Sequence, residues 1–447
     1  MIRHYPITLI VLLIFLAACT PPTPPPSPTP WPTVTPTATR TPIGAASQSQ
    51  QFTPTRTRTP TPTATATSPA LPTRTPTITS LTVWANLPEA QQQRLAQDIE
   101  AFQAEFPYYR VTLEDYETAE KFQAAIENDE LAYDVALVSP ILLHHLWRAD
   151  QLAPMADFFP PSFIDGFVAA TLQGATHDDV LWALPDTAGF HLLLFFNRDL
   201  VESPPTTVET MTEVAQTLTK GNQWGLGVNS YDPLWIIPWL APYDGWLTDP
   251  TGDPELDTEA MISALTLYQQ WHTSNDAIAS VATYEEARTQ FVNGNTAMLI
   301  DGVWAIESLS QVNNFDWGFS PLPTLDQQPA SPLVLGRYWA IKEAPQGDQA
   351  IAIATFLDYI TRPQRQLEWT QAFDLLPTQR RALNDPAIVN NPLLRVSADQ
   401  MEAGRGLSLG VEANALLDVM RSPLQGVIAG ELTPEEAAKL MQEQLDP

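Results

Sequence analysis

Cysteine and histidine are scarce in this chain, whose 447 residues include one cysteine, Cys19, and six histidines. One cysteine cannot form an intramolecular disulfide, and it leaves no thiol for catalysis in the rest of the chain. His144 and His145 are adjacent, and neighbouring positions of a helix point about 100° apart, which does not suit joint metal chelation. No P-loop, nucleophile-elbow, zinc-protease or EF-hand pattern occurs either. The sequence therefore predicts no metal, no cofactor and no catalytic residues.

Positive charge is also scarce. The chain has 22 Lys and Arg residues against 51 Asp and Glu residues, a formal net charge of −29. Five of the arginines and none of the acids lie in residues 1–80, so the remainder is more acidic still. Nucleic-acid binding needs a cationic surface, and an anionic ligand or lipid surface would be repelled. The composition therefore argues against nucleic acid as a partner and is compatible with a neutral ligand.

The amino terminus carries a targeting segment. Arg3 is followed by an apolar run over residues 7–15 and then by Leu16-Ala-Ala-Cys19. Such a run is too short to span a bilayer as a mature helix, and small residues before a cleavage site are typical of a secretory signal. Leu-Ala-Ala-Cys resembles the lipobox of bacterial lipoproteins, which implies cleavage before Cys19 and lipidation of that cysteine. An ordinary secretory signal with an incidental cysteine is the alternative.

Low-complexity sequence follows over residues 20–79. Residues 20–80 hold 16 of the 43 prolines and no Asp or Glu, and Thr, Ala and Ser make up most of the rest. A segment without aliphatic bulk cannot bury a core, and Pro-rich chains favour extended polyproline geometry. We predict a disordered tether, so that a lipid anchor would attach the protein to the membrane without spanning it. The Thr-Pro-Thr repeats are also compatible with glycosylation or with a stalk through a cell wall.

Strand-like and helix-like segments alternate from Leu81 onward, which predicts an α/β fold with a largely parallel sheet covered on both faces. The folded part is longer than one core usually supports, and no low-complexity linker divides it. Expected strands lie at 81–84, 110–114, 134–138, 181–186, 190–197, 224–228, 296–300, 317–321 and 338–341, and expected helices at 89–106, 119–128, 141–147, 207–220, 257–273, 283–293 and 347–373.

The segment 287–306 organises the expected functional site. Asn293-Gly294 predicts a helix stop, residues 296–300 an apolar strand, and Asp301-Gly302 a turn. Trp304 then lies just beyond the carboxyl end of that strand, the edge at which open α/β sheets bind ligands. A large aromatic side chain in that place can stack on an apolar ligand face.

This segment resembles the signature of the extracellular solute-binding proteins of ABC importers, in the sugar-binding branch of that family. Val303 stands where the family usually has proline. Other motifs, among them Leu-Trp-Ala-Leu-Pro-Asp at 181–186 and Phe-Asn-Arg-Asp-Leu at 196–200, follow one another in the family's order, so the resemblance covers nearly all of 80–445. The residues that match the signature are Phe291, Gly294, Ala297, Met298, Asp301, Gly302 and Trp304.

The resemblance implies a two-lobe fold of the periplasmic-binding-protein type, with three crossovers between the lobes and a central ligand cleft that closes by hinge motion. It also implies a sugar as the small-molecule ligand, ABC permease subunits as partners, a monomer, and a location outside the cytoplasm on the outer face of the cell membrane. The implied divisions are a signal peptide 1–19, a tether 20–79, a first lobe 80–187 and 334–376, and a second lobe 188–333 and 377–447.

Thirteen tryptophans supply many possible ligand contacts. Aromatic faces bind the apolar face of a pyranose, while carboxylates and amides bind its hydroxyls. Core packing is the alternative for the aromatic candidates, and helix capping, hinge or surface roles are the alternatives for the polar ones. Tyr338 and Trp339 alternate along a strand, and Trp235 and Trp239 lie four apart on an expected helix, so we expect one member of each pair to face the cleft. The candidate ligand-binding residues are Trp84, Asn86, Asp186, Trp235, Trp239, Trp304, Tyr338, Trp339 and Glu412.

The sequence departs from the maltodextrin-binding members of the family at several of their ligand positions. Val138, Ile141 and Phe190 stand where those proteins carry a tryptophan, an aspartate and a glutamate, and Leu417 stands near their late tryptophan. These departures argue against a maltodextrin and leave another sugar or small neutral solute.

Two other functions remain open from the sequence. A ligand-sensing domain that reports to a partner signalling protein would use the same fold. A surface carbohydrate-active enzyme would need paired carboxylates such as Glu114/Asp115 or Asp178/Asp179. Charged surface is the simpler interpretation of such pairs in a chain this acidic.

Overall fold

The computed structural model describes residues 78–273, 282–343 and 345–445. The predicted signal peptide, Cys19 and the tether up to residue 77 lie outside this part of the chain. The first described strand, β1 (Thr79–Ala85), begins where the proline-rich sequence ends. Among the described helices, none is both long and apolar enough to cross a membrane.

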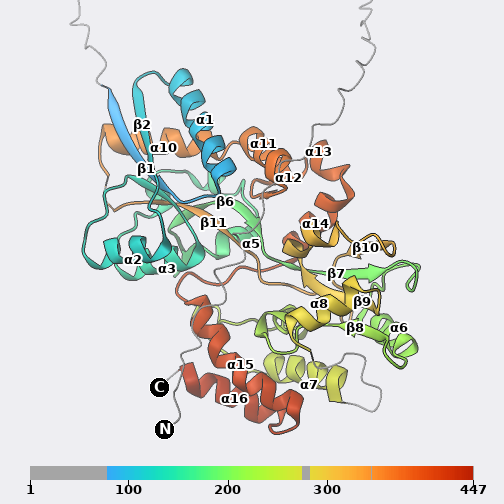
Figure 1. The fold of residues 1–447 in the computed structure, drawn as a ribbon. Coiled ribbons are helices and arrows are strands. Elements are labelled where there is room, and N and C mark those ends of the chain that lie inside the picture. The colour runs from blue at the N-terminus through green and yellow to red at the C-terminus, as the bar shows by residue number, and fades with distance from the viewer. Residues whose placement is uncertain (1–77, 274–281, 344, 446–447) are drawn as a thin grey trace, which may run out of the picture. The chain divides into compact units, whose positions relative to one another are not determined.

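The first sheet has six strands in the order β12-β6-β11-β3-β1-β2 (Figure 1). β1 is parallel to β2 and β3, but β11 is antiparallel to β3 and β6, and β12 is antiparallel to β6. The prediction of a largely parallel sheet is therefore wrong. Only β1, β2 and β3 are joined by single helices, whereas β11 and β12 return from later parts of the chain. The remaining strands of this sheet are β2 (Tyr109–Glu114), β3 (Val135–Val138), β6 (Ala183–Gly189), β11 (Leu335–Ile341) and β12 (Leu376–Pro377).

The second sheet has four strands in the order β10-β7-β9-β8, of which only β8 and β9 run parallel. All seven residues of β9 are buried, as expected for a strand covered on both faces. The strands are β7 (Leu192–Asn197), β8 (Trp224–Gly227), β9 (Thr296–Gly302) and β10 (Trp317–Ser320), and a separate hairpin pairs β4 (Thr176–His177) with β5 (Val180–Leu181).

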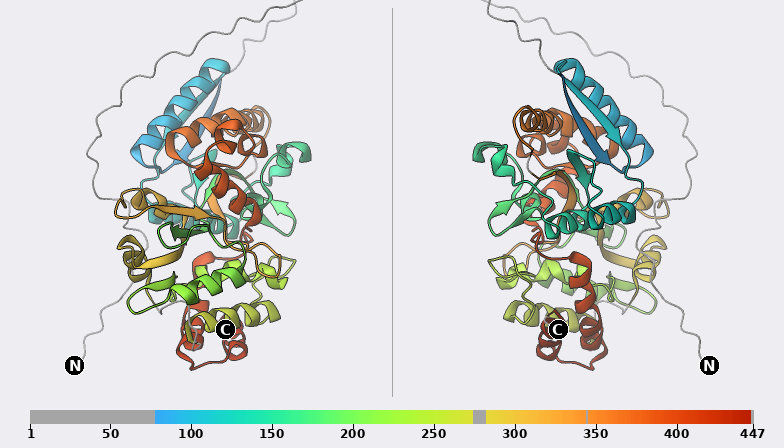
Figure 2. Two further views of the ribbon diagram at one scale, coloured as in Figure 1. Left: turned by 90° about the vertical axis from the view of Figure 1, so that its right-hand side faces the viewer. Right: turned by 90° about the vertical axis from the view of Figure 1, so that its left-hand side faces the viewer.

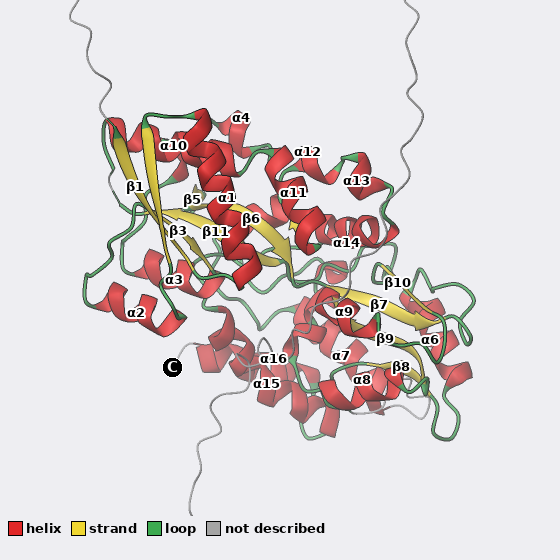
Figure 3. Ribbon diagram, turned by 45° about the horizontal axis from the view of Figure 1, so that its top comes forward, coloured by secondary structure: helices red, strands yellow, loops and turns green. Residues whose placement is uncertain are grey.

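The chain crosses between the two sheets at several points. β6 of the first sheet ends at Gly189 and β7 of the second begins at Leu192, while β10 of the second sheet is followed by β11 of the first (Figure 3). β12 is in turn followed by helices whose last two members pack with the second sheet. The two sheets therefore do not correspond to two consecutive domains, because the chain passes repeatedly from one to the other.

Helices cover both faces of the first sheet. On one face α1, α10 and α11 pack on alternate strand residues such as Val83 and Trp339. On the other face α2 and α3 pack on the intervening residues, including Tyr338. The pleat of β11 thus places Tyr338 and Trp339 in different cores. The helices are α1 (Glu89–Glu105), α2 (Ala119–Glu127), α3 (Pro140–Arg148), α10 (Asp348–Ile360) and α11 (Pro363–Phe373).

The helices around the second sheet come from the segment between its strands and from the carboxyl terminus of the chain. α6, α7, α15 and α16 share one large core with the sheet, and α8 and α9 contribute to a second cluster on β7 and β9. In both views of Figure 2 the red carboxyl-terminal helices lie beside the yellow-green α7, which they contact. These helices are α6 (Val208–Leu218), α7 (Glu259–Thr273), α8 (Tyr284–Val292), α9 (Ile306–Leu309), α15 (Ala413–Ala429) and α16 (Pro434–Leu445). The helices elsewhere are α4 (Pro161–Ile164), α5 (Ala169–Gln173), α12 (Arg380–Leu383), α13 (Pro386–Val389) and α14 (Pro392–Ala403).

Two helical predictions need correction, and proline is the reason for both. The stretch that carries Trp235 and Trp239 forms three consecutive 3₁₀ turns, not an α-helix. Pro238 and Pro242 have no N–H to donate, so an α-helix cannot continue through them undisturbed. Pro363 likewise begins α11 and divides the predicted helix 347–373 in two. The turns are η2 (Pro233–Trp235), η3 (Ile237–Trp239) and η4 (Ala241–Tyr243).

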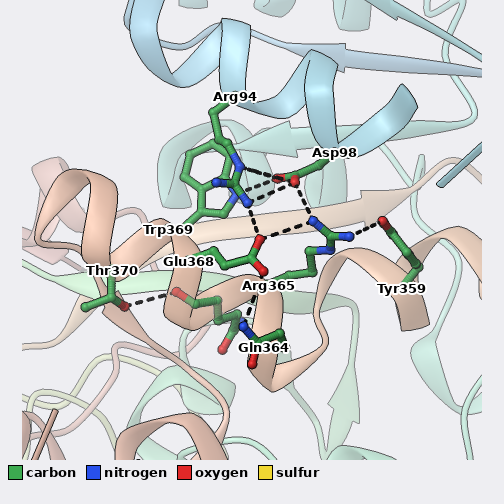
Figure 4. A network of polar contacts seen from close by, with 9 residues as sticks. Arg94, Asp98, Tyr359, Gln364, Arg365, Glu368, Trp369 and Thr370 are labelled. Carbon is green, nitrogen blue, oxygen red and sulfur yellow. Dashed lines mark hydrogen bonds and ion pairs between the residues drawn. The ribbon is translucent and has the colours of Figure 1, made fainter. Parts of the chain in front are cut away.

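A network of charged side chains joins α1 to α11 (Figure 4). The Asp98 side chain is only 2% exposed, and its carboxylate pairs with Arg94 and with Arg365, each at 3.1 Å. Trp369 Nε1 donates to Asp98 Oδ2 at 2.7 Å, and Glu368 pairs with both arginines. We call these five residues the Asp98 network. A buried carboxylate with three donors compensates its lost hydration, so the network is well suited to hold the two helices together.

Candidate functional site

Trp304 lies directly after β9, in the 3₁₀ turn η5 (Val303–Ala305), and it is half-buried. Its ring lies over the backbone of Gly302: a Cβ atom added there would be 2.1 Å from the ring. Only glycine leaves that space. The sequence prediction that Trp304 follows the carboxyl end of this strand is confirmed.

Three further aromatic rings surround Trp304, and we call the four residues together the aromatic platform. The Phe190 ring lies 4.6 Å from the Trp304 ring, centroid to centroid, at an interplanar angle of 35°. Trp235 meets Trp304 edge to face at 6.3 Å. Tyr284 accepts a hydrogen bond from Trp304 Nε1 at 3.1 Å. Four separate segments of the chain, the β6–β7 crossover, η2, α8 and η5, therefore build the platform.

Polar atoms of the platform are bound within the protein. Tyr284 Oη also accepts from Arg288 Nη1 at 2.7 Å. Trp235 Nε1 donates to the carbonyl of Ile300 at 2.7 Å. Since Phe190 has no polar atom, the platform offers ring surface and little else to a ligand.

Asp301 lies under the platform at the end of β9. Its Oδ1 accepts from the Gly302 N–H at 2.7 Å, whereas Oδ2 is buried and has no hydrogen-bond partner. Burial raises the pKa of Asp301 to about 7 from an ordinary 3.8, against the opposing effects of the Gly302 hydrogen bond, Arg288 and Tyr284. Asp301 therefore changes charge near neutral pH, close to the ring that the sequence singles out.

Two candidates at the end of β1, Trp84 and Asn86, bind the end of β2 and the loop that follows it. Trp84 Nε1 donates to Glu114 Oε2 at 3.0 Å. Asn86 Nδ2 donates to Asp115 Oδ1 at 2.8 Å and to the carbonyl of Glu117 at 3.0 Å. Trp84 is half-buried, and Asn86 is exposed. Both retain surface at the carboxyl ends of β1 and β2, where the topology allows a ligand contact.

Asp186 belongs to an ion pair that sequence reasoning missed. Its Oδ2 lies 3.1 Å from Arg337 Nη2, and its Oδ1 accepts from Trp339 Nε1 at 3.0 Å. Burial raises the pKa of Asp186, while the nearby Arg337 lowers it. Arg337 is one of few cations in this acidic chain, but no local motif marks it. Only the pairing of β6 with β11 brings it to Asp186.

Four other candidates have structural roles in this conformation. Trp239 and Trp339 are 0% and 1% exposed and lie in the two main cores. Tyr338 is 1% exposed, and its hydroxyl would be 2.2 Å from a Cβ added at Gly174. Glu412 caps α15 by accepting from the N–H groups of residues 414 and 415 at 3.1 and 2.6 Å. Of the nine sequence candidates, the structure brings Trp235 to Trp304 and Trp339 to Asp186.

A small hollow lies between α3, β11 and the segment 407–413. It is lined mainly by apolar side chains, among them Ile141 and Leu335, and its volume is about 20 Å³. This is room for about one water molecule, so the hollow does not admit a sugar in this conformation. His144 Nδ1 lies 2.8 Å from the carbonyl of Leu409 and joins α3 to the segment 407–413.

Comparison with known proteins identifies a family with this architecture. Residues 97–396 match the family described as bacterial extracellular solute-binding proteins. The maltotriose-binding protein of Pyrococcus abyssi is 24% identical over 255 residues, 55% of this chain and 55% of that protein. The galactooligosaccharide-binding protein of Bacillus subtilis is 22% identical over 286 residues, 61% of this chain and 66% of that protein. The chain thus spans just over half to about two thirds of the length of these relatives.

Solved structures show the same fold. A cyclo/maltodextrin-binding protein complexed with maltotetraose has a TM-score of 0.71 and 18% identity, over 82% of this chain and 97% of that one. The maltose/maltodextrin-binding domain of Bdellovibrio bacteriovorus has a TM-score of 0.60 and 23% identity, over 82% and 98%. The α/β two-lobe fold of the periplasmic-binding-protein type is therefore confirmed. Since the family match extends over most of the chain and the fold agrees with it, this protein belongs to the family of bacterial extracellular solute-binding proteins.

Proposed function

We propose that this protein is the substrate-binding subunit of an ABC importer and that it binds a carbohydrate or a similar neutral solute between two lobes. The first lobe would comprise 80–187 and 334–376, and the second 188–333 and 377–447. Family membership supports a binding role without chemistry, and the printed names of the relatives, a maltotriose-binding and a galactooligosaccharide-binding protein, support a sugar.

The observation that carries the proposal is the position of Trp304. It is a half-buried indole ring after the carboxyl end of a fully buried strand, held by Tyr284 and by close contact with Gly302. Such a ring is preorganised to stack on the apolar face of a pyranose, because little side-chain freedom is left to lose on binding. Asn86 and Trp84, which keep exposed surface on the first lobe, would contact the sugar from the other side.

Charge and targeting support the same role. The net charge of −29 disfavours anionic ligands, so a neutral solute suits the protein best. A lipidated Cys19 and the tether 20–79 would keep the binding domain outside the cytoplasm and close to the permease. The resulting high effective concentration would allow it to bind the membrane subunits even with low intrinsic affinity. We expect the binding subunit to act as a monomer.

A ligand screen on the full chain tests the proposal. Thermal-shift measurements against a panel of mono- and oligosaccharides should give at least one ligand that raises the melting temperature, and small-angle scattering should show compaction with that ligand, as hinge closure requires. Absence of any shift across the panel would contradict a carbohydrate ligand. Cleavage of a panel sugar by the protein would contradict the binding-only role.

A further inference from the structure

Resting on the carbohydrate-binding role proposed above, we propose that the ligand is an aryl glycoside whose aromatic group contacts Phe190 and Trp304. The aryl group would lie against the aromatic platform of the second lobe, and the sugar would be bound by polar groups of the first. Phe190 is then the residue that selects for the aglycone.

The backbone of Phe190 is the first observation. It has φ = +63°, and its side chain is 50% exposed. Every other described non-glycine residue with positive φ is Asp, Glu or Gln. A left-handed conformation costs roughly 1–2 kcal/mol for a residue with a Cβ atom. The Phe190 ring contacts Trp304 but stays half exposed, so this contact offsets only part of the cost, which points to a ring retained for a further contact.

The second observation is that the indole N–H groups of the platform are already bound within the protein, so the platform offers few hydrogen-bonding groups to a sugar. Trp304 Nε1 is bound to Tyr284, and Trp235 Nε1 is bound to the carbonyl of Ile300. Tyr284 Oη already accepts two hydrogen bonds. The apolar face of a sugar can stack here, but sugar hydroxyls that the platform encloses would lose hydration with few protein partners in return, which is unfavourable. An apolar aromatic group has no such penalty.

The hollow beside β11 offers a second apolar surface. Phe190 follows Gly189, which pairs with Leu335 of β11. Leu335 in turn lines the hollow with Ile141, whose side chain is 37% exposed. No Asp, Glu, Lys or Arg lines that hollow. The walls of this hollow are therefore mainly apolar and free of Asp, Glu, Lys and Arg, and they match an uncharged ligand with an apolar substituent.

Matched glycosides test the inference on the full chain. Isothermal titration would compare methyl, cyclohexyl and phenyl glycosides of glucose, galactose, mannose and xylose, so that only the aglycone changes within each series. Phenyl glycosides should bind about tenfold more tightly than methyl glycosides of the same sugar, a difference of about 1.4 kcal/mol. Cyclohexyl glycosides should fall between them, because they keep the apolar area but lack the ring quadrupole.

Two substitutions at Phe190 assign the preference to this residue. Phe190→Ala removes the ring, and Phe190→Gly removes the ring and also relieves the left-handed backbone. Both should reduce the phenyl-to-methyl ratio to about one, while only Phe190→Gly should raise the melting temperature. Asp374→Gly, at φ = +55° in the cap of α11, is the matched control and should leave the ratio unchanged.

Each outcome decides a different point. Equal binding of phenyl and methyl glycosides would overturn the inference and leave carbohydrate binding intact. Equal binding of phenyl and cyclohexyl glycosides would overturn the aromatic specificity. Retention of the preference in Phe190→Gly, or tighter binding of every glycoside by it, would show that Phe190 is not the aryl contact. If no glycoside of these series binds but a sugar of the thermal-shift panel does, only the aryl-glycoside inference is overturned. If neither the glycosides nor the panel sugars bind, the carbohydrate-binding proposal is overturned as well.

Discussion

The Asp98 network and the aromatic platform solve opposite physical problems. In the Asp98 network a carboxylate that is 2% exposed meets two arginines and an indole N–H, and every contact joins α1 to α11 or stays within one of them. In the aromatic platform an exposed phenylalanine adopts a left-handed backbone, and beneath the platform a buried carboxyl oxygen of Asp301 has no partner. In the first region the buried charged groups all have hydrogen-bond or ion-pair partners. The second region leaves ring surface exposed and one titratable oxygen without a hydrogen bond.

This contrast separates stability from binding. Breaking a buried charge pair whose partners are all bound costs much stability, but such a pair has no free hydrogen-bonding group for a ligand. Unsatisfied surfaces weaken the free protein, and ligand contact can repay that cost. The following substitutions test whether the two regions divide the roles in this way.

Asp98→Ala should have the largest effect on stability. It leaves Arg94 and Arg365 without their shared buried partner, and breaking a buried pair in this way costs about 3–5 kcal/mol. Chemical denaturation measures the loss. Asp358→Ala is the control, because its carboxylate is 53% exposed and pairs with Arg362 only at 3.7 Å; we expect about 0.5 kcal/mol or less there. Equal effects of the two substitutions would contradict a special role for the Asp98 network.

Trp304→Ala should have the largest effect on binding. Loss of one stacked aromatic side chain removes roughly 2–3 kcal/mol of contact, which corresponds to a decrease in affinity of about 30- to 150-fold. Titration of the best ligand from the sugar panel measures this decrease. Trp317→Ala, a half-buried tryptophan of β10, is the control and should retain affinity. Unchanged affinity in Trp304→Ala would remove the platform from the binding site.

Gly302→Ala should displace the Trp304 ring without removing it. The added Cβ would be 2.1 Å from the ring, and such overpacking costs about 1–3 kcal/mol. We expect weaker ligand binding and a shift in tryptophan fluorescence. Gly189→Ala is the control because a Cβ there meets no atom within 4 Å. A normal affinity in Gly302→Ala would show that the ring position has little influence on binding.

Asp301→Asn should have the smallest effect, visible only as a change in pH dependence. The folded pKa of about 7 lies above the ordinary 3.8, so the folded state binds this proton more tightly than the unfolded state. The resulting stability is complete below about pH 4 and decreases as the pH rises to about 7. Asp301→Asn should remove this decrease. Denaturation at pH 4, 5.5 and 7 would compare the two proteins, and identical slopes would show that Asp301 titrates normally.

Much of the secondary structure could be predicted because its signals are local. The strand over 296–300 and the stop at Asn293-Gly294 appear in the structure as β9 and a left-handed Gly294 at φ = +77°. Proline was the exception: Pro238 and Pro242 break the predicted helix around Trp235 because each removes a backbone donor.

The candidate site was harder to predict because it is assembled from distant segments. Trp304 was identified from its strand and turn, but Tyr284, Arg337 and the contact of Phe190 carry no local signal. Trp235 and Trp239 are both buried in the same core, at 4% and 0% exposed, yet only Trp235 contacts Trp304. The prediction of strand direction in the first sheet was wrong for the same reason, because β11 and β12 enter this sheet from later parts of the chain.

The sequence by itself determined the position of Trp304 after a buried strand, the excess of negative charge and the family resemblance, because composition and short-range pattern carry these properties. Only the tertiary structure decided which tryptophans keep exposed surface and which charges are paired. Exposure and pairing depend on what packs against a side chain, and that is set by segments up to hundreds of residues away, as when Asp98 meets Trp369 across 271 positions.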